Sequence, residues 1–294
     1  MTTAPLISPH ALEQLQAQAK ALGSHNASPR LSPLSGSQRS SHRGSGVELQ
    51  DLRGYEFGDD IRHMAWRSSA KTGRPMVKVF HAEKQARRLL CVEQYSDMYF
   101  ATAGELKAAT AVRAAALLCF NGLFKQAQIG GLTWGQGRHS FPYSHRLEQT
   151  LALLQSINLS QPPQTHSEPQ RLVEQLCQLA SQPCDLYLIS DFNHWQTQHI
   201  RALGQLTAQH TLYAIQIIDR GEQSLVDLGK LRISSPGDGE RFLIDTRNAQ
   251  LRQRYNAAMR AKQGALTEAF KQAKVEHLLC YTHADILPTL APLL

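Results

Sequence analysis

The pattern of apolar and polar positions changes character near residue 87 of this 294-residue chain. Beyond that point, short apolar runs of strand length alternate with longer segments whose apolar residues recur at helical spacing. The clearest strand is "CDLYLISDF" at 184–192, and the clearest helix is the Ala-rich stretch 104–127. Alternation of this kind predicts an α/β domain with a doubly wound, mostly parallel sheet and helices on both faces.

The same reading supplies the other elements of this domain. Two strands joined by a Gly-rich turn are expected at 128–134 and 137–143, and two short edge strands lie around a "PGDGE" turn at 229–235 and 240–246. The remaining strands are expected at 87–94, 210–219 and 275–283, and the remaining helices at 145–157, 169–182, 194–209 and 247–273.

The N-terminal third follows a different pattern. Residues 8–22 predict a helix with Ser8 as N-cap and Pro9 at its first position. Residues 24–46 are rich in Ser, Gly and Pro, which favours an extended or flexible segment, and 75–85 predict a strand. We therefore divide the chain into an N-terminal region, residues 1–86, and an α/β domain, residues 87–294.

Composition narrows the class of protein. Apolar residues make up 42% and charged residues 19% of the chain, as in ordinary globular proteins. No apolar run reaches the roughly 18 residues that a membrane span needs, and the start lacks the features of a secretory signal. Five scattered cysteines without a C-x-x-C pair argue against a disulfide framework or a zinc site. We expect a cytoplasmic protein.

The net charge of +7 is concentrated at the N-terminal end. Residues 1–88 hold 13 Lys and Arg against 7 Asp and Glu, whereas residues 89–294 hold 18 against 17. A basic excess suits an acidic partner, including nucleic acid, or a solvated surface. Because acids are interleaved and no nucleic-acid module is present, the solvated surface is favoured and nucleic-acid binding is kept as the alternative.

The densest polar stretch is "GYEFGDDIRHMAWRSSAKTGRP" at 54–75. Asp59 and Asp60 follow a glycine, which is good turn chemistry, and adjacent turn carboxylates usually point apart. An ion-paired, rigid loop is therefore favoured over a catalytic pair, with partner docking as the other role. Arg62 and Trp66 are four residues apart, so on a helical turn they would share a face. We expect Trp66 to be a packing anchor and Arg62 to bridge to one of the aspartates.

Enzyme motifs are missing from the chain. The stretch 131–137 is not a phosphate-binding loop, and Ser190 does not lie in a nucleophile elbow. The histidines have no partner set that specifies general-base catalysis. Two predicted strands do end on carboxylates, Glu93 and Asp191, at the edge where sites of doubly wound sheets form. We expect a non-enzymatic protein without a cofactor.

Residues 45–80 are similar to the signature of the family called domain of unknown function 58. In that family, Arg-x-Tyr-x-x-Gly-Asp-Asp-x-Arg-x-Ile-x-Trp, then Ala-Arg-x-Gly, precedes a von Willebrand factor A-like domain. The resemblance implies that fold for residues 87–294. The matching positions are Arg53, Tyr55, Gly58, Asp59, Asp60, Arg62, Trp66, Ala70, Lys71 and Gly73.

The resemblance also implies where a metal site would lie. The family's A-like domain often keeps an Asp-x-Ser-x-Ser motif that binds Mg²⁺ after its first strand. Here "EQYSDMYF" places Glu93, Tyr95 and Asp97 at the ligand positions, and Asp191 matches the second acid. A phenol and a longer acid replace compact oxygen ligands. We expect Glu93, Asp97 and Asp191 to form a degenerate site that does not hold Mg²⁺, with a metal-dependent ligand binder as an alternative.

Family members are commonly encoded beside MoxR-type AAA+ ATPases. The resemblance therefore implies an adaptor or scaffold that links such an ATPase to client proteins during assembly, maturation or stress tolerance. The sequence names neither the client nor the oligomeric state. The predicted docking surface combines the ends of two strands, at Glu93 to Asp97 and Asp191, with a signature loop that comprises Arg53, Tyr55, Gly58, Asp59, Asp60, Arg62, Trp66, Lys71 and Arg74.

Overall fold

The computed structural model divides the chain into two compact units. Unit 1 comprises Met1–Ala27 and Ala86–Leu294, and unit 2 comprises Ser28–Gln85. Most of the Ser/Gly/Pro-rich segment, from residue 26 onward, and the "PGDGE" turn at 236–240 lie outside the described residues. The structure describes residues 5–25, 49–80, 86–102, 104–135, 139–158, 168–234 and 241–294.

Unit 1 is built on a six-stranded sheet in the order β10-β7-β6-β3-β4-β5. All neighbouring pairs are parallel except β4 and β5, which form an antiparallel edge. Chain order reverses beside β3, as in doubly wound folds. The predicted sheet is confirmed, and its strands are β3 (Arg87–Gln94), β4 (Gln128–Gly135), β5 (His139–Ser144), β6 (Asp185–Ser190), β7 (Thr211–Ile218) and β10 (Glu276–Tyr281).

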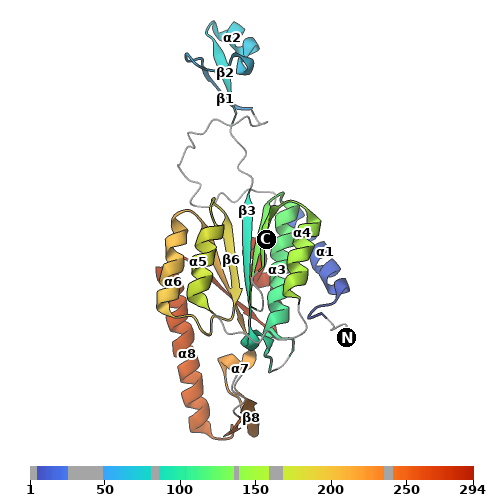
Figure 1. Ribbon diagram of the computed structural model, residues 1–294, viewed down its shortest axis with the longest axis vertical. Helices are drawn as coiled ribbons and strands as arrows, with labels where there is room; N and C mark the ends of the chain where they lie inside the picture. The colour runs from blue at the N-terminus through green and yellow to red at the C-terminus, as the bar shows by residue number, and fades with distance from the viewer. Residues whose placement is uncertain are drawn as a thin grey trace. The chain divides into compact units, whose positions relative to one another are not determined.

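Helices cover both faces of the sheet, and each face has its own apolar core (Figure 1). Residues buried on both sides of a parallel strand form nearly continuous apolar runs, which is why "LLCV" in β3 is fully buried. One face carries α1 (Pro9–His25), α3 (Lys107–Phe124), α4 (Leu147–Ile157) and α9 (Leu287–Leu290). The other carries α5 (Pro169–Leu179), α6 (Thr197–Leu203) and α8 (Ala249–Gln272).

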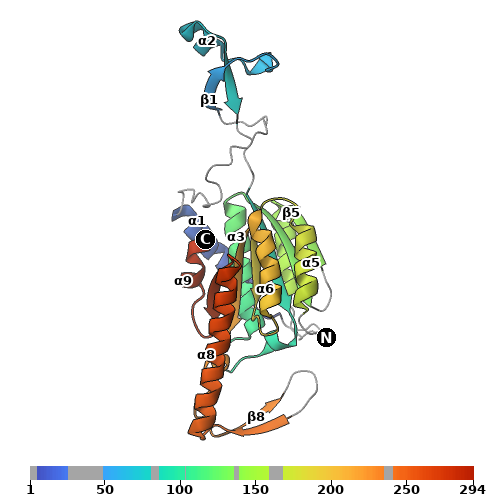
Figure 2. The ribbon, with the colours of Figure 1, turned by 90° about the vertical axis from the view of Figure 1, so that its left-hand side faces the viewer.

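The short elements lie at the ends of the strands and helices. The strands β8 (Lys230–Ser234) and β9 (Arg241–Asp245) pair with each other in a separate antiparallel sheet and do not join the edge of the large one. Figure 2 shows β8 beside the end of α8 that lies away from the large sheet. The other short elements of unit 1 are η3 (Ser96–Tyr99), η4 (Gly204–Ala208), α7 (Arg220–Gln223) and η5 (Ala291–Leu293).

Helix α1 belongs to unit 1, although it was grouped by sequence with the region 1–86. Its Leu15 and Ala19 are buried in the core that contains α3. The Ala-rich surface of α3 allows a close approach of the two helices, because alanine side chains are short. Asn158 holds the chain just before α1 through two hydrogen bonds of 2.9 Å with the backbone of Ile7. The reason for this difference is long-range packing that helix periodicity does not report.

Unit 2 is a small antiparallel pair, β1 (Leu49–Gly54) and β2 (Met76–Phe80), connected through η2 (Ile61–His63) and α2 (Trp66–Thr72). Ala65 and Val77 are buried between them. The hydroxyl of Ser69 accepts from the backbone N–H of Met76 at 2.8 Å and so joins α2 to β2. Across the described part of both units, no helix combines the length and apolar character that crossing a membrane requires.

Replacing Leu15 by Ala tests whether α1 is an integral part of unit 1. The side chain is only 3% exposed, so the substitution should lower the free energy of unfolding by about 2–5 kcal/mol. Chemical denaturation measures this change, with Gln18→Ala at an exposed position of the same helix as the control. Equal, small effects of both substitutions would contradict the docked position of α1.

Candidate functional site

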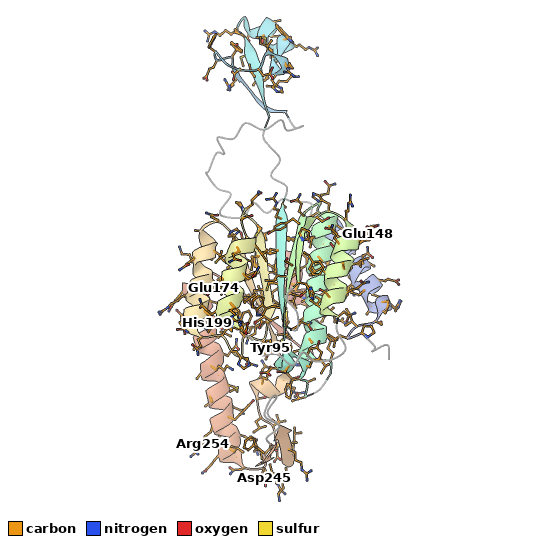
Figure 3. All side chains as sticks on the ribbon, viewed as in Figure 1. Tyr95, Glu148, Glu174, His199, Asp245 and Arg254 are labelled. Atoms are coloured by element: carbon orange, nitrogen blue, oxygen red, sulfur yellow. The ribbon has the colours of Figure 1, made fainter. Side chains whose placement is uncertain are left out.

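Acidic side chains gather at the carboxyl-end edge of the large sheet. Glu93 lies near the end of β3, whereas Asp191 and Asp219 directly follow β6 and β7. All three are buried, with at most 1% of each residue exposed. Parallel strands end at the same edge, so the sequence separation of these residues does not prevent their meeting. Figure 3 places Tyr95 at this edge of unit 1.

A buried lysine connects two of the acids at this edge. Lys107 is the first residue of α3 and is 1% exposed. Its Nζ lies 2.6 Å from Asp191 Oδ2 and 2.6 Å from Glu222 Oε1. Burial works against the charged form, but the attraction of both carboxylates and their hydrogen bonds outweigh it and raise the pKa of Lys107. Since a cation at a helix N-terminus opposes the helix dipole, the two carboxylates are what keep this ammonium in place.

Both oxygens of Asp191 are fully occupied by hydrogen bonds. Oδ1 accepts from the Tyr95 hydroxyl and, at 2.9 Å, from the backbone N–H of Asn193. Oδ2 accepts from Lys107 and from the side-chain amide of Asn193 at 2.9 Å. Burial, and then the charges of Asp191 and Glu93, raise the pKa of Tyr95 well above its ordinary value. The phenol therefore stays protonated and acts as a donor.

The other two predicted metal ligands have different partners. Glu93 accepts a hydrogen bond of 2.8 Å from the indole Nε1 of Trp195. Asp97, which lies in η3, forms an ion pair of 2.8 Å with Nε2 of His194. That contact raises the pKa of His194 and lowers the pKa of Asp97. The pair is partly exposed, with 43% of the His194 side chain and 24% of the Asp97 side chain accessible.

This donor set does not fit a divalent cation. The oxygens of Asp191 already hold four donors, and one of these donors is the Lys107 ammonium, which occupies the side of the carboxylate that would face an ion. Among the residues that the structure describes, no three acidic, His or Cys side chains form a group that could hold a metal. The contacts give a physical reason for the degenerate character predicted for Glu93, Asp97 and Asp191, since an internal ammonium supplies the positive charge.

Asp219 also lies at the carboxyl-end edge of the large sheet, although it is not among the site residues predicted from the sequence. It accepts from the backbone N–H of Thr102 at 3.0 Å, from that of Gly221 at 2.9 Å and from the hydroxyl of Thr282 at 3.1 Å. Burial favours its neutral form, but the hydrogen bond from the Thr102 hydroxyl, together with these others, prevails and lowers the pKa of Asp219. Asp219 thereby ties the chain after β3 and the end of β10 to α7.

Signals for two of the missed residues were present in the sequence. Asp219 follows the apolar run of its strand in the same way that Asp191 follows "LYLIS". Lys107 is the cation that begins a mostly apolar, Ala-rich helix. The third missed residue, Glu222, has no such signal, because its contact with Lys107 joins positions 115 residues apart.

In unit 2, the signature loop is ion-paired as its composition predicts. Arg53 Nη2 lies 2.6 Å from Asp59 Oδ1, and Asp59 Oδ2 accepts from the backbone N–H of Glu56 at 2.9 Å. Asp60 accepts from the backbone N–H of Arg62 at 3.0 Å, with the Arg62 guanidinium 3.5 Å away. Gly58 has a φ of +106°, a conformation that L side chains rarely adopt.

Trp66 does not have the packing role expected from its spacing to Arg62. It is the first residue of α2, whereas Arg62 lies in the separate turn η2, so the two do not share a helical face. Trp66 is 67% exposed, and Phe57 and Ile61 are exposed as well, at 104% and 61%. We call the exposed set the signature surface. It comprises Phe57, Ile61, Trp66, Arg67, Lys71 and Arg74, and its last three members form no ion pair with a described residue.

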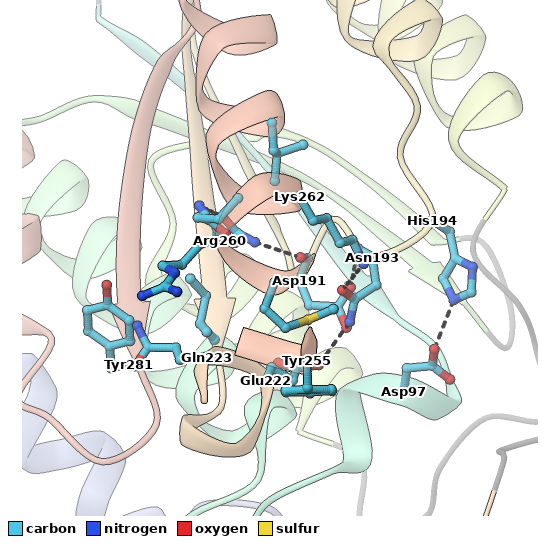
Figure 4. Close-up of a pocket in the computed structure, with 15 residues that line it drawn as sticks. Asp97, Asp191, Asn193, His194, Glu222, Gln223, Tyr255, Arg260, Lys262 and Tyr281 are labelled. Atoms are coloured by element: carbon cyan, nitrogen blue, oxygen red, sulfur yellow. Dashed lines mark hydrogen bonds and ion pairs between the residues drawn. The ribbon is translucent and has the colours of Figure 1, made fainter. Parts of the chain in front are cut away.

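We call Lys107, Asp191 and Glu222 the Lys107 cluster. A pocket of about 500 Å³ opens beside it (Figure 4). Asp191, Asn193 and Glu222 line its side toward the cluster, and the opposite wall comes from α8. On α8, Lys262 Nζ donates to Asn193 Oδ1 at 2.9 Å and so bridges helix and strand end. The pocket lies in the crevice outside the carboxyl ends of the strands, where doubly wound folds bind ligands.

Comparison with known proteins identifies related chains. Residues 51–265 match the family model described as "Protein of unknown function DUF58". Uncharacterized proteins of Mycobacterium tuberculosis and Mycobacterium bovis are each 26% identical over 214 residues, 69% of this chain. That region is 65% of their own length, so the match spans slightly less than two thirds of these relatives.

Solved structures with a related arrangement are more distant. The conserved hypothetical protein BatB of Bacteroides thetaiotaomicron is 9% identical with a TM-score of 0.36, covering 63% of this chain and 99% of its own. The vWF domain of the type V pili tip protein Mfa5 of Porphyromonas gingivalis is 12% identical with a TM-score of 0.36, covering 71% and 92%. Similarities this low say nothing about function.

Replacing Lys107 by Met should leave the buried carboxylate of Asp191 and the partly exposed carboxylate of Glu222 facing each other without a counter-charge. We expect the free energy of unfolding to fall by about 3–5 kcal/mol, and Mg²⁺ to raise the Tm of the variant but not that of the wild type. Thermal melts with and without Mg²⁺ measure both effects, with Lys271→Met at an exposed position of α8 as the control. A wild-type Tm that rises with Mg²⁺, and no longer rises after Asp191→Ala, would show an open metal site instead.

The His194–Asp97 pair should make stability depend on pH. The stabilisation from His194 is fully present below its unfolded pKa of about 6.5 and disappears as pH rises through its raised folded pKa. The stabilisation from Asp97 is present above about pH 4 and disappears as pH falls through its lowered folded pKa. His194→Gln should therefore destabilise most between about pH 4 and 6, by less than about 1 kcal/mol because the pair is partly exposed. Denaturation curves at several pH values measure this, and an effect that grows above about pH 8 would contradict it.

Proposed function

This chain belongs to the family of proteins of unknown function DUF58, and on that premise we propose that it is a non-enzymatic protein-interaction adaptor. Its partner is a MoxR-type AAA+ ATPase, which it links to client proteins during assembly, maturation or stress tolerance. The observation that carries the proposal is the Lys107–Asp191–Glu222 cluster, in which Lys107 and Asp191 are buried, at the edge of the sheet where a catalytic site would form.

The cluster favours a scaffold because its groups are bound to one another. A general base or nucleophile needs a free lone pair facing substrate, whereas Asp191 accepts four hydrogen bonds from within the chain. Glu93 is 0% exposed and offers no surface to a substrate or a partner. Burial of Glu93 and Asp191 also removes them from the predicted docking surface, which leaves Asp97 as the accessible carboxylate of that set.

We place the docking site for the ATPase on the signature surface of unit 2. Exposed aromatic and arginine side chains dominate the binding energy of protein interfaces. Phe57, Ile61 and Trp66 are large apolar groups left in water, while Arg53–Asp59 and Asp60–Arg62 hold the loop that presents them. A rigid loop loses little conformational entropy on binding, so its exposed groups contribute more to affinity.

Affinity capture from the native cells tests the adaptor function. The tagged full chain, incubated in Mg²⁺-ATP, should recover an AAA+ ATPase that mass spectrometry identifies. The double variant Phe57→Ser/Trp66→Ser should recover at least about tenfold less, since truncating an interface hot spot costs about 2 kcal/mol or more. Phe124→Ser, which alters an exposed aromatic of unit 1, should recover the same amount as wild type.

Two outcomes of the capture experiment would overturn the proposal. Exposed aromatics beside unpaired cations also suit single-stranded nucleic acid. Capture of nucleic acid without an ATPase, lost steeply as salt increases, would make the chain a nucleic-acid binder. If the double variant recovers as much ATPase as the wild type, the signature surface is not the docking site. A repeat in EDTA with nucleotide separates metal dependence of the interface from nucleotide dependence of the ATPase.

A further inference from the structure

The pocket beside the Lys107 cluster contains hydrogen-bond donors that have no partner among the described residues. They are the guanidinium of Arg260 on α8, the side-chain amide of Gln223 on α7 and the hydroxyl of Tyr281 at the end of β10. Figure 4 shows these three side chains together on one side of the pocket. Three separate elements thus bring donors to one place, while neighbouring polar groups such as Gln216 are already hydrogen-bonded.

The acidic residues of the pocket are not available to attract a cation. Asp191 and Glu222 share the ammonium of Lys107, and Asp97 is paired with His194. The open polar groups of the pocket can therefore all donate hydrogen bonds, and one of them, the guanidinium, is permanently charged and cannot accept. An arginine guanidinium with adjacent neutral donors is suited to a planar anion, which it binds through two parallel hydrogen bonds.

Three apolar side chains contribute to the walls of the pocket. Ile218 and Leu266 line the pocket and are 6% and 8% exposed, and Met259 lies beside them on α8. Ligand sites typically combine apolar walls with a few convergent polar groups that fix orientation. The ligand should therefore carry a short apolar body next to its anionic group.

Charge selects the kind of anion. Lys107, Arg260 and Lys262 are matched by Asp97, Asp191 and Glu222 in and directly beneath the pocket, and His194 adds one positive charge when protonated. The buried carboxylates Glu93 and Asp219 also act on His194 and Tyr255 of the lining. A site without positive excess suits a monoanion better than a phosphate dianion, because these carboxylates would repel the dianion more strongly. We propose that this pocket binds a carboxylate with a small apolar body, held by Arg260, Gln223 and Tyr281. The carboxylate is that of a small molecule or of a polypeptide C-terminus.

The pocket is lined by residues of unit 1, whereas the signature surface belongs to unit 2. Either proposal can therefore be wrong while the other is right. Titration calorimetry of the full chain with butanoate should show saturable binding with a Kd of about millimolar, as expected for roughly six heavy atoms. Butanamide, which has the same shape without the charge, should bind at least about tenfold more weakly, because it lacks the charge-assisted hydrogen bonds. Inorganic phosphate at equal ionic strength should not compete.

Matched variants locate the binding. Arg260→Gln should weaken butanoate binding at least about tenfold, through loss of the bidentate contact, and Tyr281→Phe by a smaller factor. Arg254→Gln, an exposed position nearer the start of α8 (Figure 3), should leave binding unchanged. Thermal melts confirm that each variant is folded. Equal binding of butanamide, no heat with butanoate up to about 50 mM, or unchanged binding in Arg260→Gln would overturn the proposal.

A peptide arm distinguishes the source of the carboxylate. A hexapeptide that ends in valine with a free carboxylate is compared with the same peptide amidated at its C-terminus. Binding of the free acid at least about tenfold tighter than butanoate, and lost on amidation, identifies a polypeptide C-terminus. Affinity no greater than that of butanoate identifies a small-molecule carboxylate. Loss of ATPase capture in the Phe57→Ser/Trp66→Ser variant with butanoate binding intact would show that the two functions are separate.

Discussion

A lysine ammonium enclosed between two carboxylates is the interaction on which the carboxyl-end edge of this protein depends. Removing such a charge from water costs several kcal/mol, and only close partners with good geometry offset that cost. Lys107 meets the requirement through contacts of 2.6 Å with Asp191 and Glu222. Because Asp191 follows β6, Glu222 lies in α7 and Lys107 begins α3, this one cation joins three segments that are distant in the chain.

The surrounding side chains follow from that arrangement. Once Asp191 accepts from Lys107, its other lone pairs are satisfied by Tyr95 and Asn193. Asp219 performs the corresponding task beneath α7, where it holds Thr102, Gly221 and Thr282. The edge that carries metal or catalytic chemistry in many doubly wound proteins is here a closed polar network. Hydrogen-bond donors without a partner among the described residues lie in the adjacent pocket, which α8 lines.

In unit 2 the ion pairs lie at or near the surface instead of being enclosed. Its ion pairs, Arg53–Asp59 and Asp60–Arg62, are at or near the surface and contribute little stability by themselves. Their effect is to shape a turn at Gly58 that leaves large apolar groups in contact with water. Within the described part of unit 2, residues 49–80, the short sheet buries few side chains and offers no apolar layer that covers Phe57 or Trp66. At its carboxyl-end edge unit 1 thus encloses Lys107 and Asp191 within the fold, whereas unit 2 displays both charges and apolar groups.

The sequence by itself determined the strands and main helices of the mostly parallel sheet domain and the ion-paired loop, because apolar periodicity and turn chemistry are local properties. It also indicated that Glu93 and Asp191 lie at one edge, since parallel strands end together. It did not predict the short elements β1, α2, α7 and α9. Only the tertiary structure decided that Lys107 fills that edge, that α1 packs on α3 and that Trp66 is exposed. Each of these outcomes depends on which distant segments meet, and residue spacing carries no record of contacts between positions 84 or 115 residues apart.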